Sequence, residues 1–430
     1  MNPTAKKAVA VVVVALILLL PLAWLRSLVS ERTALREQAI ASVARGWGGR
    51  QELSGPILAI PVTTTSDNGL TRTSDWYVLP ESLTLDVELT VQDERRKLGV
   101  YEVPVYVAKV HATGQFDLER AIARFTAGND SIHVHPEQGR VFIPIGDTRG
   151  LRKVESLGVP LTDAAFEPGQ GFPIAVLTAP LRTDINLSKG QHAFDMTLEL
   201  AGTQSLSFMP LSHSSTVRAR GNWPNPGFAS GFLPIERHVR DRDGRFDATW
   251  QVMDLNRSFG AHWTQGAVAV TSLRDSAFGI DLVQPVDLYQ EVERATKYAA
   301  VFICLSFLTL FIWEHLVQRP VHPVQYGLMG MALSVFFLLL LALAEHVGFL
   351  AAYLLAAVAL CVLLGIYLSG AMDSVKSGVG ASGVFGLLYA LLYLLVTSDD
   401  YALLAGSLGL FALLAVAMIL TRKVNWYQTV

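Results

Sequence analysis

The sequence predicts a membrane protein with an N-terminal anchor helix, a β-rich, sandwich-like domain outside the cytoplasm and a C-terminal bundle of five transmembrane helices. Charged residues make up only 17% of the 430 residues, whereas soluble domains carry about 25%. The charge is concentrated in Arg26–Lys297, which holds 32 of the 37 acidic residues and 28 of the 34 lysines and arginines. Long uncharged runs lie on both sides of this block, so it is the water-facing part of the chain.

The first uncharged run, Ala8–Leu25, predicts the anchor helix over residues 1–25. At about 1.5 Å per residue it nearly crosses a hydrocarbon core of roughly 30 Å. A cleaved signal peptide is the competing interpretation, but its apolar core is usually shorter and ends at a small-residue site. This run ends in Trp24 and Leu25, so we expect an anchor that is not cleaved.

Five further runs of 17 to 22 residues follow the polar block and have the length of membrane spans. They predict a five-span membrane domain over residues 298–430. The predicted spans are Tyr298–Val317, Tyr326–Ala344, Gly348–Ser369, Ala381–Thr397 and Tyr401–Thr421.

The basic residues of the short loops predict the orientation. If the spans alternate in direction, every lysine and arginine outside the polar block falls on one side of the membrane. The opposite short loops, residues 345–347 and 398–400, contain neither residue type. Cytoplasmic loops carry the excess of basic residues, so we expect both termini in the cytoplasm and the polar block outside. The basic residues are Lys6, Lys7, Arg319, Lys376, Arg422 and Lys423.

The polar block divides into a stalk helix, residues 26–50, and a β-rich domain, residues 51–297. The stalk has no Gly or Pro from Arg26 until Gly46, which is typical of a helix. Beyond it, apolar residues alternate with polar ones, as in half-buried strands, and turn signals separate them. The domain has no cysteine; Cys304 and Cys361 lie in predicted spans. The strands are expected at Leu83–Val91, Val103–Val107, Phe194–Leu200 and Phe278–Leu282, and a short helix at Leu118–Thr126.

Two motifs could carry chemistry, and each has a more ordinary interpretation that we favour. His133 and His135 have a spacing that zinc can use, but a site needs a third or fourth ligand; two exposed strand histidines are favoured. Gly378–Gly383 matches a dinucleotide fingerprint by letter, but it opens a membrane span instead of following a strand. A loop with close packing of small residues is favoured there. We expect no enzyme, no cofactor and no metal.

Other classes of function are disfavoured by charge. The isoelectric point near 6.4 offers no basic surface for nucleic acid. Ion-coupled carriers keep ionisable groups at mid-membrane, whereas the acids and histidines of the bundle lie near span ends or in loops. The hypothesis that the protein is a transporter is therefore disfavoured. These residues are Glu314, His315, Glu345, His346, Asp373, Asp399 and Asp400.

Two segments next to the spans are candidates for structure or interaction. Glu293 and Lys297 lie four apart, Glu first, which favours a helical ion pair. With Glu291 and Arg294 they are expected to form a charged collar at the headgroups, and a docking surface for a partner is the alternative. His322 and Pro323 lie in a proline-stiffened turn at 319–326, for which turn architecture is favoured over recognition.

Three blocks resemble the CreD family of bacterial inner-membrane proteins: Arg294-Ala295-Thr296-Lys297-Tyr298, His322-Pro323-Val324-Gln325-Tyr326 and Glu345-His346-Val347-Gly348-Phe349. The resemblance runs from the anchor to the C-terminus. It implies a Gram-negative inner membrane, a periplasmic β-rich domain, and a link to envelope integrity and colicin tolerance within the regulon of a two-component system. It supplies no catalytic residues. The candidate structural or interaction residues are Glu293, Arg294, Lys297, Tyr298, His322, Pro323, Tyr326, Glu345 and His346.

These observations predict an envelope-integrity protein that acts as a non-catalytic structural or interaction module through its periplasmic domain. Its expected partners are the lipid bilayer and envelope proteins, without nucleic acid. A transporter or lipid-handling protein is the alternative. A periplasmic hydrolase that uses His133 and His135 is a third hypothesis, which would require bound metal.

Overall fold

The chain divides into two compact units, which we describe separately. A computed structural model describes residues 3–65, 70–92, 96–127, 132–172, 174–182, 191–228, 231–240, 243–282, 288–317 and 321–398, with a few single residues from 404 to 419. The membrane unit comprises Met1–Arg36 and Val286–Val430, and the β-rich unit comprises Glu37–Pro285. These borders lie about a dozen residues before those expected at residues 50 and 297.

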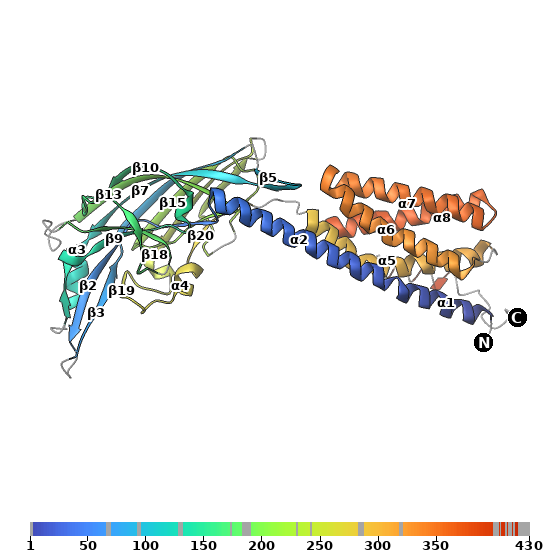
Figure 1. Cartoon of the computed structure of the whole chain (residues 1–430), viewed down its shortest axis with the longest axis horizontal. Coiled ribbons are helices and arrows are strands. Elements are labelled where there is room, and N and C mark those ends of the chain that lie inside the picture. Colours follow the sequence, from blue (N-terminus) through green and yellow to red (C-terminus); the bar gives the residue numbers. More distant parts are fainter. Residues whose placement is uncertain are drawn as a thin grey trace. The chain divides into compact units, whose positions relative to one another are not determined.

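The membrane unit is helical (Figure 1). Among the described residues, five helical stretches are long and apolar enough to cross a membrane, and they correspond to the predicted anchor and four of the five later spans. The span predicted at Tyr401–Thr421 falls where only scattered residues are described, so it stays a prediction. The helices are α1 (Pro3–Ile17), α2 (Leu19–Trp47), α5 (Leu288–Val317), α6 (Pro323–Val347), α7 (Phe349–Ala371) and α8 (Val375–Thr397).

The N-terminal helix is interrupted once, and the sequence explains the position. Pro21 has no N–H to donate to the carbonyl of Ile17, so the regular ladder is broken where α1 ends. The chain remains helical across the break because the Leu18 N–H still bonds the Val14 carbonyl at 3.0 Å. Helix α2 then runs to Trp47 and ends at Gly48, whose φ of +118° suits glycine. Anchor and stalk thus form a nearly continuous helical segment.

Helices α7 and α8 pack closely through small residues, as expected for Gly378–Gly383, but this segment lies within α8 and does not form the expected loop. A Cβ on Gly378 would lie 2.7 Å from the carbonyl oxygen of Gly365 in α7. The Ser382 hydroxyl donates to the Cys361 carbonyl at 2.7 Å, and the Tyr353 hydroxyl donates to the Tyr389 carbonyl at 2.7 Å. The glycine-rich stretch is therefore helix-packing surface inside α8.

The β-rich unit contains two large sheets and two small ones (Figure 1). In spatial order, the first large sheet is β10 (Leu151–Gly158), β13 (Gln191–Thr203), β7 (Val105–Asp117), β4 (Ser82–Val91), β15 (Ser214–Gly221), β18 (Arg245–Met253) and β17 (Glu236–Arg240). The second is β11 (Glu167–Gly169), β12 (Val176–Pro180), β9 (Arg140–Pro144), β2 (Ile57–Thr65), β3 (Thr71–Val78) and β19 (His262–Thr264), with β8 (Ile132–Val134) on β2. The small sheets are β1 (Gln51–Leu53), β14 (Ser205–Phe208), β20 (Phe278–Leu282) and β16 (Pro226–Gly227), and the pair β5 (Arg96–Leu98) and β6 (Tyr101–Val103).

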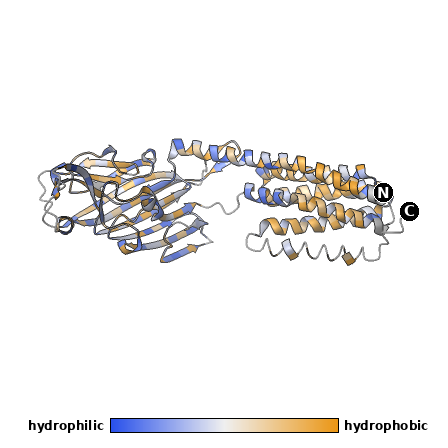
Figure 2. Ribbon diagram, turned by 90° about the horizontal axis from the view of Figure 1, so that it is seen from below, coloured by the Kyte–Doolittle hydropathy of each residue, from blue (hydrophilic) through white to orange (hydrophobic). Residues whose placement is uncertain are grey.

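One hydrophobic core joins the two large sheets, and a second covers the other face of the second sheet. Strand β2 takes part in both: Leu58 and Ile60 point into the first core, while Ile57 and Ala59 point into the second. Phe172, from a loop, and Trp263, from strand β19, complete the second core. Figure 2 shows the strands with alternating hydrophobic and hydrophilic residues and the membrane helices as mainly hydrophobic. The predicted double-sheet architecture is confirmed.

Two features of the sheets differ from the expected pattern. Most pairs are antiparallel, but β4 pairs with β15 in parallel, in register Ser82 with Ser214, and β1 pairs in parallel with β14. Such pairs join segments far apart in sequence, which local turn signals cannot reveal.

The short helix expected at Leu118–Thr126 is present as α3, capped by Asp117. A second short helix, α4 (Val270–Asp275), was not expected.

Candidate functional site: two polar clamps in the membrane unit

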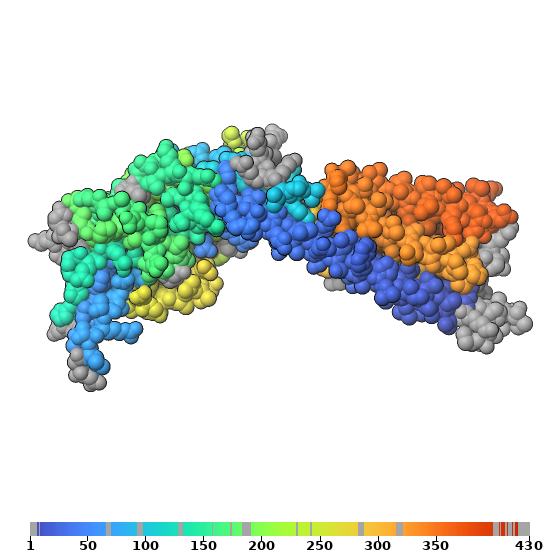
Figure 3. Space-filling model, in the orientation of Figure 1, coloured from blue at the N-terminus to red at the C-terminus, as the bar shows by residue number. Residues whose placement is uncertain are grey.

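A buried carboxylate joins three helices of the membrane unit. Glu314 of α5 has a side chain only 5% exposed, and its Oε1 lies 2.5 Å from Nζ of Lys7 in α1. Its Oε2 accepts the hydroxyl of Tyr326 in α6 at 3.1 Å and the Val321 N–H at 3.2 Å. We call this group the Glu314 clamp. Figure 3 shows the N-terminal helix lying along the later helices that the clamp joins.

The helical period of α5 places Glu314 inside. Phe307 and Leu310 lie seven and four residues before it, on the same face, and both are buried. The Tyr326 ring packs edge-on against Phe307 with centroids 5.6 Å apart, and Lys7 Nζ lies 5.9 Å from the centroid of that ring. Both carboxylate oxygens are therefore engaged in an otherwise apolar surrounding.

A second group of the same composition involves the other end of α6. Glu345 has a side chain 8% exposed; Arg32 Nε of α2 lies 3.7 Å from its Oε1, and the Tyr289 hydroxyl of α5 donates to that oxygen at 3.1 Å. We call this group the Glu345 clamp. Each clamp thus takes its cation from the N-terminal helices, its carboxylate from α5 or α6, and a tyrosine hydroxyl from the remaining helix.

The length of helix between the two clamps is similar to the thickness of a membrane. Lys7 and Arg32 are separated by 25 positions, or about 37 Å of helix. This length lies between the roughly 30 Å hydrocarbon core and the 40–45 Å of a bilayer with its headgroups. The clamps therefore fix the N-terminal helices to the C-terminal bundle at the two polar boundaries.

The predicted turn before α6 is a helix cap. His322 Nδ1 accepts the Val324 N–H at 3.3 Å, and the Gln325 side chain accepts the His322 N–H at 2.8 Å, which together form a capping box. Pro323 occupies the first helical position, where a missing N–H costs nothing. At the other end of α6, His346 is exposed, and its Nδ1 lies 3.0 Å from the Ala342 carbonyl. These histidines serve the helix ends and are not brought together.

The predicted collar lies within α5, which begins ten residues earlier than the span expected from Tyr298. Glu293 and Lys297 are exposed and form an ion pair at 3.0 Å. Arg294 Nη1 reaches the Val396 carbonyl of α8 at 3.5 Å, and Tyr298 is half-buried. Of the predicted residues, the structure brings Tyr326 and Glu345 into the clamps and leaves the collar near the helix surface.

The sequence interpretation did not identify the partners of the clamps. The sequence patterns identify Glu314 only as a charge near a span end and Lys7 only as an orientation signal, and they indicate no clamp role for Arg32 or Tyr289. The burial of Glu314 was detectable, because it shares a helical face with Phe307 and Leu310. Its pairing with Lys7, 307 positions away, carries no local signal.

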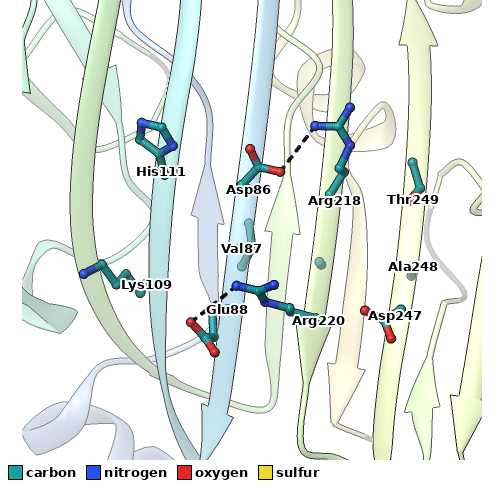
Figure 4. A pocket seen from close by; sticks show the side chains of 11 residues that line it. Asp86, Val87, Glu88, Lys109, His111, Arg218, Arg220, Asp247, Ala248 and Thr249 are labelled. Carbon is teal, nitrogen blue, oxygen red and sulfur yellow. Dashed lines mark hydrogen bonds and ion pairs between the residues drawn. The ribbon is translucent and has the colours of Figure 1, made fainter.

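The outer face of the first large sheet carries a shallow, charged groove of about 440 Å³ in the β-rich unit (Figure 4). Arg218 lies 3.5 Å from Asp86, and Arg220 lies 3.8 Å from Glu88, on neighbouring strands. Paired residues of one row alternate in sign across six strands, so the row is neutral as a whole. The row is Lys153, Glu199, Lys109, Glu88, Arg220 and Asp247.

This charged face is a self-compensating surface. Cross-strand opposite charges contribute modestly to pairing, roughly 0.2–1 kcal/mol each. Contact with Glu155 at 2.9 Å raises the pKa of Lys109 above its usual value, which favours the protonated, positively charged form of the lysine. Because the signs balance along the row, the face has no large field of one sign to attract a strongly charged ligand.

The two histidines considered for metal binding do not converge on a third ligand. His133 is exposed on β8, and His135 contacts the Thr63 hydroxyl at 3.0 Å and the Glu137 carboxylate at 3.4 Å. Within the described part of the chain, no group of three or more His, Cys, Asp or Glu side chains is placed to hold a metal ion.

The helical membrane unit and the two-sheet unit define a multi-pass membrane protein with a large β-rich domain. The profile of the family described as "Inner membrane protein CreD" matches residues 3–427. The chain is also 33% identical over 423 residues to "Inner membrane protein CreD" of Escherichia coli (strain K12), covering 96% of this chain and 91% of that relative. This chain belongs to the CreD family of inner membrane proteins, as its sequence resemblance predicts.

Proposed function

We propose that this protein is a non-catalytic structural and interaction module of the inner membrane that supports the integrity of the cell envelope. The Glu314 clamp is the observation that carries this proposal. A carrier needs an intramembrane carboxylate that can exchange partners with an ion or a substrate. Glu314 instead uses both oxygens to hold Lys7, Tyr326 and the Val321 N–H, which suits a helix-to-helix tie.

The proposed orientation places the β-rich unit in the periplasm and both termini in the cytoplasm. The basic residues of the short loops support it through the positive-inside rule. In the membrane unit, α6 and α7 are joined at Gly348, and α7 and α8 at residues 372–374, so consecutive helices reverse direction. Lys7 and Lys376 consequently belong to the same membrane side, opposite the Glu345 clamp.

The link to envelope integrity derives from the family resemblance, and the proposed partners are the lipid bilayer and other envelope proteins. The balanced outer face of the large sheet supports a structural role, since its charged groups pair with each other. A pull-down of envelope proteins with residues 26–297 would identify a partner of the β-rich unit.

Complementation of a deletion strain tests the proposal. We expect deletion to increase sensitivity to detergent or colicin, and the wild-type chain to restore resistance. Glu314→Gln should restore it only partly, because the tie between α1 and α5 is weakened. Asp373→Asn, which changes an exposed carboxylate at the same end of the bundle, should restore it fully. Unchanged sensitivity after deletion would refute the envelope role, and substrate uptake by reconstituted liposomes would favour a transporter.

A further inference from the structure

A groove of about 380 Å³ lies between α2 and α5 in the membrane unit. The α2 residues recur at intervals of three and four, and so do those of α5, so each helix contributes one face to the groove. Neither clamp fills this space. The lining residues are Arg26, Val29, Ser30 and Thr33 of α2, and Glu293, Thr296 and Lys297 of α5.

The groove lies at the level of the lipid headgroups. The uncharged run of the anchor ends at Leu25, directly before Arg26, and the uncharged run of α5 begins at Tyr298, directly after Lys297. Trp24 is 62% exposed at the same level, which is typical of the aromatic belt at a membrane boundary. Acyl chains therefore reach one end of the groove and water the other.

The polar groups that line the groove favour the binding of an anionic ligand. Arg26 forms no ion pair with any residue that the structure describes. Lys297 pairs with Glu293 at 3.0 Å and is 64% exposed, so its ammonium remains accessible to a ligand. The hydroxyls of Thr33 and Thr296 already donate to carbonyls of their own helices, at 3.1 and 2.8 Å. Two cations and one carboxylate give the lining a net charge of +1, which complements a ligand of charge −1.

We propose that this groove binds the headgroup of an anionic phospholipid of the phosphatidylglycerol class. The phosphate lies between the Arg26 guanidinium, whose planar fork matches phosphate oxygens, and the Lys297 ammonium. The glycerol hydroxyls donate to the Glu293 carboxylate, and the acyl chains extend from the groove toward the uncharged runs of α2 and α5. A phosphatidylethanolamine headgroup is disfavoured because its ammonium would be a third cation in the groove.

The bound lipid bridges the N-terminal helices and the bundle beside the Glu345 clamp. Thr33 follows the clamp residue Arg32, and Glu293 lies one helical turn after the clamp residue Tyr289. The lipid and the clamp therefore hold α2 against α5 at the same boundary. This role is independent of the envelope function proposed above.

Native mass spectrometry of the full-length protein in neutral detergent tests the proposal. Dihexanoyl-phosphatidylglycerol, dihexanoyl-phosphatidylethanolamine and inorganic phosphate are titrated in parallel. We expect saturable binding of the phosphatidylglycerol, at least tenfold weaker binding of the ethanolamine lipid, and no retention of free phosphate. Equal retention of the two lipids, or retention of phosphate alone, would overturn the assignment of an anionic lipid site.

Variants locate the site. The double change Arg26→Gln with Lys297→Gln should lower phosphatidylglycerol affinity about thirtyfold, since each cation contributes roughly fivefold near an anionic lipid. Lys376→Gln removes an exposed lysine at the opposite membrane boundary and should leave the affinity unchanged. Wild-type affinity in the double variant, or an equal loss of affinity in Lys376→Gln, would contradict the proposal.

Discussion

At the scale of single residues, Glu314 shows how a charge is accommodated in an apolar bundle. A buried ion is expensive unless a counter-ion and hydrogen bonds satisfy it. Lys7 supplies the counter-ion, and Tyr326 with the Val321 N–H supplies two donors. The carboxylate therefore favours the arrangement in which α1, α5 and α6 meet.

The energetic coupling in the Glu314 clamp is measurable by a double-mutant cycle. Glu314→Gln or Lys7→Met alone should each destabilise the protein by about 3 kcal/mol, because removing one partner leaves the other buried and unpaired. The double variant should lose clearly less than the sum of the single losses. Unfolding in mixed micelles with increasing SDS measures these changes. Additive losses would show that the two side chains are not coupled.

Asp147 in the β-rich unit gives a pH-dependent prediction. The Arg149 guanidinium, hydrogen-bonded to it at 2.9 Å, lowers the pKa of Asp147 against the opposing effect of burial, and the Gly49 N–H lowers it further. A lowered folded-state pKa stabilises the protein above the unfolded value, near 4, and this contribution is lost as the pH falls through the folded value.

We therefore expect Asp147→Asn to destabilise the β-rich unit by about 1 kcal/mol at pH 7, a typical value for a charge-assisted hydrogen bond that is partly exposed. The difference from wild type should shrink below about pH 4, where the wild-type carboxylate also becomes protonated. Urea unfolding of the full chain at several pH values, followed by tryptophan fluorescence, measures it. A constant difference from pH 7 to pH 3 would contradict this role of the charge.

At the scale of elements, the apolar runs and the alternating strands were predictable because each is a local pattern. Strand β20 coincides with the segment expected at Phe278–Leu282, and α3 coincides with Leu118–Thr126. The first ten residues of α5 were not predicted, because the expected span was defined by the apolar run that begins at Tyr298. The helix begins earlier, in a segment of mixed polar and apolar residues. The parallel pair β4–β15 depends on tertiary structure and leaves no local signal.

The close crossing of α7 and α8 gives a prediction at this scale. Gly378→Val should destabilise the membrane unit by about 1–3 kcal/mol, because its side chain would meet the backbone oxygen of Gly365 and force the helices apart. Gly383→Val is the matched control in the same helix, since a Cβ there has no neighbour within 4 Å. Thermal unfolding in detergent compares the two. Equal stability of both variants would argue against close packing at Gly378.

At the scale of the whole molecule, the distribution of charge along the chain predicted which parts are membrane helices and which part is the water-facing β-rich block. It could not predict the clamps, because each joins residues from opposite ends of the sequence. The family blocks around Tyr326 and Glu345 did include one member of each clamp. Their roles became clear only when the structure supplied Lys7 and Arg32 as partners.

Labelling of single cysteines in spheroplasts tests the proposed topology, in which a β-rich domain in the periplasm is attached to a bundle with cytoplasmic ends. After Cys304 and Cys361 are replaced by alanine, His238→Cys on exposed strand β17 and Lys376→Cys at the start of α8 provide one probe on each side. We expect a membrane-impermeant maleimide to label position 238 in intact spheroplasts and position 376 only after lysis. Labelling of position 376 in intact spheroplasts, with position 238 protected until lysis, would contradict it.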